Sequence, residues 1–344
     1  MISVRGGRSN TVRQKSVGDP KHHHFLPQFY LRRFADGREG LYQIEKVGSS
    51  REIPTKVSKA GSKRNFHTLD WKDDEVDRST IEARLSVVEG RQEKMLKELL
   101  KNPEYIADWR SELSKFVSLM YHRVPNFKRD IERSLKDTVN SASRMLLRNG
   151  KFPEPPESLK ELIKEKGDDI FDVQISNWKL VEQMFDLAAR SPIQRILDSM
   201  NCRILDVEEE SLHLVTSDSP VVLFDASHDP DSPYGRGFAH KSVEVSIPLS
   251  QNKLLIFSHS SITDSRLSRE RVRHINRRMI VAADRFIYTP ETSEEFLEDM
   301  DLLHSQQAGF VGSTFDHDDG AAIISKVVPV TERHLKSGRV KIKP

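Results

Sequence analysis

Cysteine is almost absent from this 344-residue chain, which contains Cys202 alone. A single thiol excludes an intramolecular disulfide and any zinc site built from several cysteines. No apolar run approaches the roughly 18 residues that a membrane-spanning helix needs. The first ten residues lack the apolar core of a signal peptide. We therefore expect a cytoplasmic protein without membrane association.

Net charge is also nearly absent, because 54 Lys and Arg residues face 52 Asp and Glu residues. No overall field therefore selects an anionic partner. The distribution is less even, since residues 1–64 hold 14 basic and 5 acidic side chains. We interpret residues 1–20, which carry Gly, Ser, Arg and Lys without periodicity, as a disordered basic arm. Such an arm can contact phosphate, and a solvated tail explains the same composition.

Standard catalytic and cofactor motifs are missing. The chain has no Walker loop, no G-x-G-x-x-G, no G-x-S-x-G and no H-E-x-x-H. No acidic pair followed by E-x-K indicates a restriction-type nuclease core, and the histidines lack the spacing of a ββα-metal nuclease. No cofactor is identified. The run His22, His23 and His24 is compatible with binding of a divalent metal, although adjacent histidines in one strand or helix cannot all face one ion.

The order of the patterns predicts an α+β fold. Residues 41–46 and 53–57 alternate like paired strands, and the middle of the chain has helical periodicity. The predicted helices cover 79–99, 106–121, 127–148, 158–166 and 176–199, followed by β-rich runs at 203–207, 212–216, 221–224, 243–248, 254–258, 286–288 and 322–330, with helices at 268–283 and 292–306. This order predicts a small N-terminal β element, a helical middle and a mixed β-rich C-terminal domain.

Boundaries follow from proline and from helix-start signals. Pro153, Pro155 and Pro156 predict a linker at 151–160. It would separate an N-terminal motif plus helical region (21–150) from helices followed by the β-rich region (161–344). Ser79 to Glu82 has the spacing of a capping box, which predicts the start of a helix.

The stretch 21–36, K-H-H-H-F-L-P-Q-F-Y-L-R-R-F-A-D, has the highest density of chemically capable side chains. Pro27 is suited to the first position of a helix. Tyr30, Leu31 and Phe34 then recur at helical spacing. We predict a short helix over 27–35, with Tyr30 in the core and its hydroxyl satisfied.

Residues His24 to Phe34 closely resemble H-x-x-P-Q-x-Y-L-x-x-F, the signature of DUF4238, a mostly bacterial family of unknown function. Later pieces fit that family in order: 65–68, Glu82 and Glu89, 123–125, 216–221, 248–250 and Asn276. His67 stands where the family has an aromatic residue, and Val124 where it has Thr. The resemblance spans about residues 21–290. Because the family brings no established chemistry, it indicates relatives rather than a reaction.

The candidate site residues come from these motifs. The predicted catalytic residues are His24, Glu89 and Asp218, and the predicted substrate-binding residues are Gln28, Arg33, Arg123 and Asn276. His24 titrates near neutrality and suits a general base. Arg123 suits an anion or a pairing with Glu89. Structural explanations compete with each role: an Asp-x-Pro turn accounts for Asp218, and solvation accounts for the arginine-rich helix around Asn276.

Two hypotheses follow. In the first, these side chains converge on a cleft, and the protein is a nuclease-like or phosphodiesterase-like hydrolase acting on nucleic acid or nucleotide. A role in stress or phage defence is an analogy. In the second, the protein is a non-catalytic module that binds nucleic acid or protein, and the same residues form a structural polar network. The first hypothesis requires His24, Glu89, Arg123 and Asp218 to share one solvent-open pocket.

Overall fold

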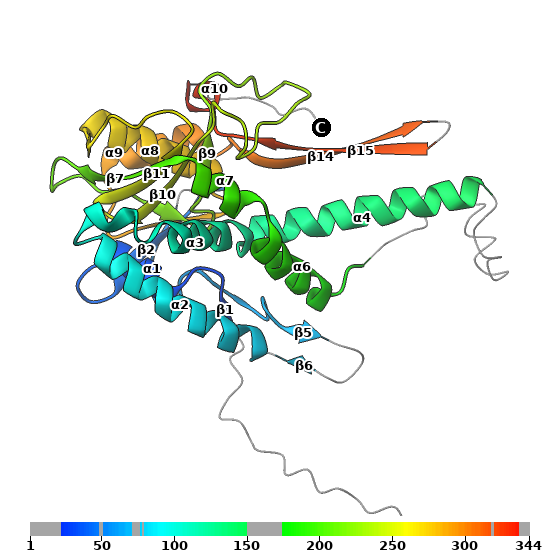
Figure 1. Cartoon of the computed structure of the whole chain (residues 1–344), viewed down its shortest axis with the longest axis horizontal. Coiled ribbons are helices and arrows are strands. Elements are labelled where there is room, and N and C mark those ends of the chain that lie inside the picture. Colours follow the sequence, from blue (N-terminus) through cyan, green and yellow to red (C-terminus); the bar gives the residue numbers. More distant parts are fainter. Residues whose placement is uncertain are drawn as a thin grey trace, which may run out of the picture.

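The computed structural model describes residues 22–47, 51–70, 76–77, 79–149, 174–317 and 320–336. It confirms the predicted α+β class, with helices packed beside a four-stranded antiparallel sheet and a five-stranded mixed sheet (Figure 1). The predicted arm at 1–20, the linker at 151–160 and the helix at 158–166 lie outside the described residues.

One sheet joins strands from the two ends of the chain. Its order is β3-β2-β13-β8, with β2 Gly40–Glu45, β3 Glu52–Lys56, β8 Thr216–Ser217 and β13 Phe286–Thr289. The pairing of β2 with β3 confirms the two strands predicted near the N-terminus. Since β2 also pairs antiparallel with β13, with Ile44 opposite Ile287, the N-terminal β element is built into the C-terminal sheet.

A second sheet has the order β12-β7-β11-β10-β9. Its strands are β7 Asn201–Val207, β9 Val222–Phe224, β10 Glu244–Ser250, β11 Lys253–Ser258 and β12 Arg266–Leu267. β10 and β11 have runs of consecutive buried residues, as expected for strands covered on both faces. The run predicted at 212–216 reaches a strand only at Thr216.

Helices cover these sheets. They are α2 Thr80–Leu99, α3 Arg110–His122, α4 Pro125–Arg148, α6 Asn177–Arg190, α7 Ile193–Ser199, α8 Arg269–Ala282, α9 Glu294–Leu303 and α10 Glu332–Lys336, with a 3₁₀ turn η2 at Pro103–Ile106. The single helix predicted over 176–199 is wrong: α6 ends at Arg190, and Pro192 precedes α7, because proline supplies no backbone N–H inside a helix.

The long helix α4 extends away from the sheets, and the hairpin of β14 (Gly309–His317) and β15 (Gly320–Val328) runs beside it (Figure 1). Sequence patterns predicted only the second of these strands. The small β5 (Leu69–Asp70) and β6 (Val76–Asp77) pair before α2.

The start of α2 differs from the predicted capping box. Ser79 makes no side-chain cap hydrogen bond. Asp77 takes this role, since its Oδ1 accepts from the backbone N–H groups of Ser79 at 2.8 Å and Thr80 at 3.0 Å. Glu82, the other member of the predicted box, instead contacts His67. The carboxylate of Glu82 is therefore directed toward the protein interior rather than to the helix terminus.

The predicted helix over 27–35 forms as α1 (Gln28–Leu31) followed by a 3₁₀ turn η1 (Arg32–Phe34). Tyr30 is fully buried, and its hydroxyl contacts Thr216 Oγ1 at 2.7 Å and donates to the Pro248 carbonyl at 2.9 Å. This confirms Tyr30 as a core residue with a satisfied hydroxyl. Its contacts fasten the N-terminal motif to the C-terminal sheets.

Gly61 packs against the start of the same motif. Its carbonyl accepts from the N–H groups of Phe25 and Leu26. Its φ of +59° is in the left-handed region, and a Cβ there would lie 2.8 Å from the Cβ of Leu26. Only glycine fits both conditions.

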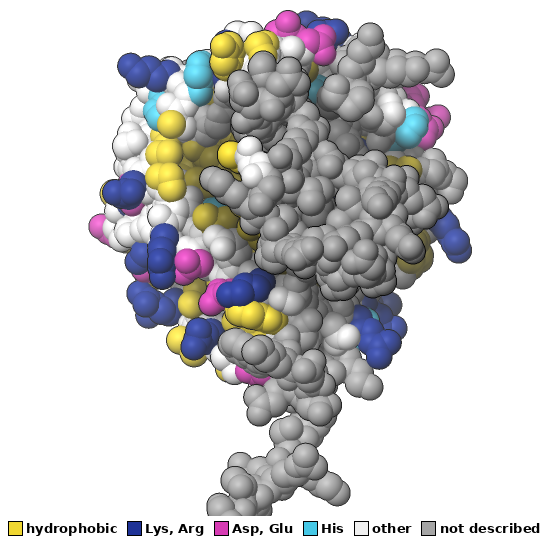
Figure 2. All heavy atoms as spheres, turned by 90° about the vertical axis from the view of Figure 1, so that its right-hand side faces the viewer, with side chains coloured by type: hydrophobic (Ala, Val, Ile, Leu, Met, Phe, Trp, Pro, Cys, Tyr) yellow, Lys and Arg dark blue, Asp and Glu magenta, His cyan; other side chains and the backbone are white. Residues whose placement is uncertain are grey.

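Within the described residues, no helix is long and apolar enough to cross a membrane. Figure 2 shows basic and acidic side chains interspersed with small hydrophobic groups on the coloured part of one face. Local clusters of charged side chains are therefore better candidates for a binding site than the overall electrostatic field.

Candidate functional site

The histidine run forms strand β1 (His22–His24), which pairs antiparallel with β4 (Ser62–Arg64). Successive side chains of a strand point to opposite faces. His22 is exposed, His23 is fully buried and His24 is half-buried. The three imidazoles thus occupy different environments and do not form one site together.

A buried arginine brings together three of the predicted site residues. Arg123, at the end of α3, is 1% exposed. Its Nη1 donates to Glu89 Oε1 at 2.9 Å, and its Nη2 donates to the His24 carbonyl oxygen at 2.8 Å. These bonds link α3, α2 and β1, and charge-assisted bonds of this kind are stronger than neutral ones. Arg123 holds His24 through its backbone, so the imidazole is oriented separately.

The imidazole of His24 hydrogen-bonds to the backbone of Ser58, and its Nε2 is buried without a partner among the described residues. Burial lowers its pKa below the ordinary value. The neutral ring is therefore favoured at neutral pH.

A second cluster lies next to this arginine and consists of His23, His67 and Glu82, here called the His–Glu cluster. His67 Nδ1 lies 2.7 Å from Glu82 Oε1, and the His67 backbone N–H donates to His23 Nδ1 at 2.7 Å. The two imidazole rings are nearly parallel, with centroids 5.7 Å apart. His67 Nε2 is buried with no partner among the described residues. Burial, with a further contribution from the Arg123 charge, places the pKa of His67 well below its usual range.

A left-handed residue directs His67 inward. Asn65 has a φ of 56°, a conformation that Asn adopts more readily than most residues. The chain then turns, with the Thr68 N–H donating to the Asn65 carbonyl, and Phe66 and His67 enter the core. Lys128 Nζ donates to the Phe66 carbonyl at 2.8 Å and lies 4.6 Å from the centre of its ring. The backbone hydrogen bond of Thr68 and the contacts of Lys128 therefore both hold this turn in place.

The His–Glu cluster has the donor chemistry of a divalent metal site. One ligand atom from each of His23, His67 and Glu82 lies within 4.8 Å of the others, and imidazole with carboxylate suits zinc and neighbouring transition metals. Coordination through His23 Nδ1 would give up the hydrogen bond from the His67 N–H. That loss costs about 1–3 kcal/mol, and a new bond from His23 Nδ1 to the metal would offset it. The hydrogen bond therefore does not exclude a metal.

Asp218 lies elsewhere, directly after β8, and its side chain contacts the connection between α8 and β13. Its two carboxylate oxygens accept from the backbone N–H groups of Asp284 at 2.9 Å, Arg285 at 2.8 Å and Phe286 at 2.9 Å. Burial, followed by repulsion from Asp284, raises its pKa to about 7, although the three N–H donors act in the opposite direction. Lys46 Nζ donates to the carbonyls at the end of α8 next to it. Asp218 therefore has a structural role, because it holds the backbone between α8 and β13 in place.

Asn276 also has a structural role, because it holds a neighbouring backbone segment. Its Oδ1 accepts from the Val215 N–H at 3.0 Å, and its Nδ2 donates to the His213 carbonyl at 2.9 Å. The amide bridges both groups of one chain segment to α8. Both of its polar atoms are therefore engaged.

Gln28 and Arg33 do not join the network around Arg123. Arg33 is half-buried, its Nε has no partner among the described residues, and burial lowers its pKa despite nearby Glu93. Gln28 is half-buried at the start of α1, and no side-chain hydrogen bond forms to another described residue. Of the seven predicted site residues, the structure thus joins His24, Glu89 and Arg123, and separates them from the other four.

The largest cavity formed by the described residues that we identify is an open cleft of about 810 Å³. Its basic lining consists of Lys59, Lys63, Arg64, Lys128, Arg129 and Arg285, and its acidic lining of Glu132, Asp218 and Asp284. Arg129 makes a bidentate pair with Asp284. Lys63 and Arg64, on β4, have no acidic partner among the described residues.

This basic cleft lies against the other side of the turn that carries His67, since Asn65 and Phe66 line it. Of the predicted catalytic residues, Asp218 lines the cleft, and His24 and Glu89 do not. Arg123 does not line it either. Sequence reasoning missed the cleft because its basic residues come from β4, α4 and the segment before β13. The only signal was the basic surplus in residues 1–64.

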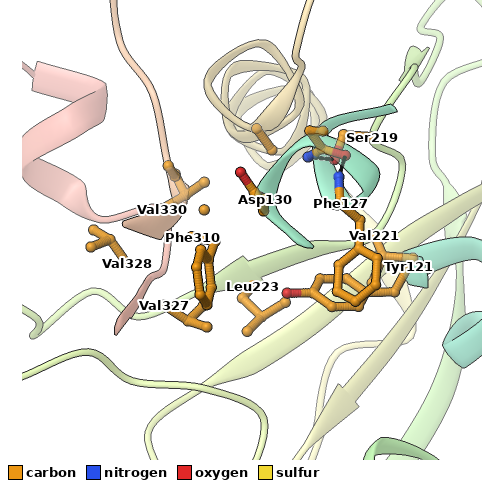
Figure 3. Close-up of a pocket in the computed structure, with 14 residues that line it drawn as sticks. Tyr121, Phe127, Asp130, Ser219, Val221, Leu223, Phe310, Val327, Val328 and Val330 are labelled. Atoms are coloured by element: carbon orange, nitrogen blue, oxygen red, sulfur yellow. Dashed lines mark hydrogen bonds between the residues drawn. The ribbon is translucent and has the colours of Figure 1, made fainter. Parts of the chain in front are cut away.

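A smaller cavity of about 50 Å³ lies on the other side of α4, against the base of the β14–β15 hairpin. Figure 3 shows Asp130 and the Tyr121 hydroxyl pointing into it among Phe127, Leu223 and Phe310. Burial raises the pKa of Asp130 to about 6, and burial raises that of Tyr121 to about 12. Among the described residues, Asp130 has no ion pair or side-chain hydrogen bond. The cavity has room for water molecules.

Comparison with known protein families matches residues 22–293 to the family described as "protein of unknown function (DUF4238)". The chain belongs to the DUF4238 family. The match covers more than three quarters of the 344 residues and includes Arg123, both polar clusters and all the residues named above as lining the basic cleft. Comparisons with curated proteins and with solved structures give no match.

Proposed function

We propose that this DUF4238 protein binds a phosphate-bearing ligand, nucleic acid or nucleotide, in the basic cleft. The observation that carries the proposal is the excess of basic over acidic side chains around an open cavity of about 810 Å³. Clefts lined by one sign of charge concentrate oppositely charged ligands. The proposal keeps the partner class expected from the sequence and relocates the contacts to a different set of residues.

The basic residues differ in availability. Arg129 pairs with Asp284, and Arg285 pairs with Glu45. Lys63 and Arg64 are exposed on β4 and have no acidic partner among the residues described. These two side chains are the first candidates for phosphate contacts, because a ligand need not displace a carboxylate to reach them.

The aromatic lining favours recognition of the phosphate backbone over the bases. Phe25, Phe66 and Tyr288 are nearly or fully buried, and only Phe286 of the four aromatic lining residues is partly exposed. Proteins that read single strands by stacking present several aromatic faces to the bases. We therefore expect binding with strong salt dependence and little base preference.

A binding role has more geometric support than hydrolysis. Asp218 is the only predicted catalytic residue in the cleft lining, and its oxygens already accept three backbone N–H groups. His24 and Glu89, the other two, are absent from that lining. Hydrolase activity stays a prediction, and the assay below includes it.

The test is fluorescence anisotropy of the full chain with labelled single-stranded RNA, single-stranded DNA, duplex DNA and ATP across a salt series. We expect binding that weakens steeply with salt. The double variant Lys63→Ala/Arg64→Ala removes two phosphate contacts. For a single strand, it should lower affinity by about tenfold or more and reduce the salt slope by about 1.4.

Lys97→Ala/Lys101→Ala serves as the matched control, because both lysines are exposed on or just after α2 and do not line the cleft. This control should bind like the unmodified protein. Equal losses in both double variants would mean that charge acts without regard to place, which contradicts the cleft. Incubating the same nucleic acids with and without magnesium, and measuring cleavage, tests the hydrolase prediction directly.

A further inference from the structure

We propose that the His–Glu cluster is a binding site for one first-row divalent cation, with zinc as the reference ion. The site is independent of the basic cleft and of its proposed ligand. It would join β1, the turn after β4 and the start of α2 through His23, His67 and Glu82.

The composition of the cluster supports a cation. His23 and His67 are fully buried, and the Glu82 side chain is 28% exposed. Their ligand atoms lie within 4.8 Å of one another, and donor atoms around a tetrahedral zinc are about 3.3 Å apart for bonds of about 2.0–2.2 Å. Small shifts of the side chains would therefore complete the coordination.

The second observation is the contact between His67 Nδ1 and Glu82 Oε1. The two atoms lie 2.7 Å apart, which requires a shared proton. A cation held by these two atoms would take the place of that proton and release it to solvent. The opposite ring nitrogen of His67, Nε2, is buried without a hydrogen-bond partner among the described residues and is not a ligand in this arrangement.

The positive charge of Arg123 does not exclude the cation. Arg123 influences His67 electrostatically, but its guanidinium is paired with Glu89 at 2.9 Å and with the His24 carbonyl at 2.8 Å. Glu89 thus offsets the charge of Arg123 beside the cluster. The three side chains would leave the fourth tetrahedral position to a water molecule, on the side of the partly exposed Glu82.

The experiment uses the full chain without a histidine tag, purified without chelators. Elemental analysis should find about one equivalent of a first-row metal, and a strong chelator should lower the melting temperature. Cobalt(II) added to the stripped protein should give the visible absorption of a tetrahedral site. Glu82→Gln should weaken zinc binding by at least about 100-fold, the upper end of what loss of an outer-shell partner costs.

Two controls separate this site from other histidines and carboxylates. His22→Ala removes an exposed imidazole of the same run, and Glu93→Gln alters an exposed carboxylate eleven positions further along α2. Both should retain the metal. The proposal is overturned if the unmodified protein has no stoichiometric metal, no cobalt spectrum and no thermal response to zinc. It is equally overturned if His22→Ala abolishes binding while Glu82→Gln retains it.

Discussion

Two sets of polar side chains differ in how completely their hydrogen bonds are satisfied. Asp218 accepts three backbone N–H groups next to β13, and Asn276 on α8 uses both of its amide atoms on the backbone. Around β1 and α2, His24 Nε2, His67 Nε2 and Arg123 Nε are buried without partners among the described residues. Polar side chains that complete a backbone connection need no further partner, whereas each buried unpartnered atom needs an explanation of its own, such as an ordered water, strain or a bound ion.

The largest expected loss of stability comes from a substitution of Asp218, whose hydrogen bonds are satisfied. Asp218→Ala leaves three backbone N–H groups without their acceptors, and each buried unsatisfied group costs about 1–3 kcal/mol. We expect the free energy of unfolding to fall by about 3–5 kcal/mol, measured by urea denaturation. Zinc should not restore this loss. A decrease below about 1 kcal/mol would show that the carboxylate does not hold this connection.

A smaller effect is expected in the second set, around β1 and α2. Arg123→Met removes the partner of Glu89 and the donor to the His24 carbonyl. Glu89 is partly exposed and keeps some hydration, so we expect a loss of about 2 kcal/mol, below the usual cost of breaking a fully buried pair. A double-mutant cycle with Glu89→Gln should give a coupling energy of about 1 kcal/mol. Additive losses would mean that the two side chains act separately.

Asp130, in a mostly apolar cavity, adds a carboxylate that has no ion pair among the described residues, and its effect on stability depends on pH. Its folded pKa is raised to about 6, so the folded state favours the protonated acid. Its contribution to stability is fully present below about pH 4 and is lost as pH rises through 6. Asp130→Asn should therefore match the unmodified protein near pH 4 and exceed it by about 1–2 kcal/mol at pH 8, after allowance for partial exposure.

Urea denaturation at both pH values measures this difference. Asp137→Asn, on the same helix, is the control, since it should leave the pH dependence unchanged. An equal advantage of Asp130→Asn at both pH values would contradict the titration and indicate a packing effect.

The smallest effect concerns the start of α2, next to the His–Glu cluster. Asp77→Ala removes the acceptor for the Ser79 and Thr80 N–H groups and should cost about 1 kcal/mol, as for other N-caps. Ser79→Ala should cost only a few tenths of that. Thermal unfolding measures the loss of stability in each variant. A larger loss for Ser79→Ala than for Asp77→Ala would support the capping box that the sequence predicted.

Local patterns predicted the helices and strands better than the site. Apolar periodicity predicts α2 and α4 because burial of one face repeats along the chain. The network of Arg123 depends on contacts between residues 34 and 99 positions apart, which no local pattern encodes. The pairing of Arg123 with Glu89 was nevertheless predictable, as opposite charges near a proline-terminated helix end.

His67 shows why the remaining site was not predictable. As a lone histidine between Phe66 and Thr68, it has no motif spacing to a second ligand. Its importance follows from the left-handed Asn65, which turns it toward the N-terminal strand. Glu82 was assigned to a helix cap for the same reason: its sequence neighbours suggested a local partner, and its actual partner is tertiary.

The sheet order β3-β2-β13-β8 has a consequence for biosynthesis. Arg285 and Glu45, whose side chains form an ion pair, are 240 positions apart. The edge of β2 that β13 covers thus stays uncovered on the ribosome until most of the chain has been made, and loop closure of this length slows folding. Transient cover by a chaperone, and synthesis at lower temperature, should therefore raise the yield of native protein.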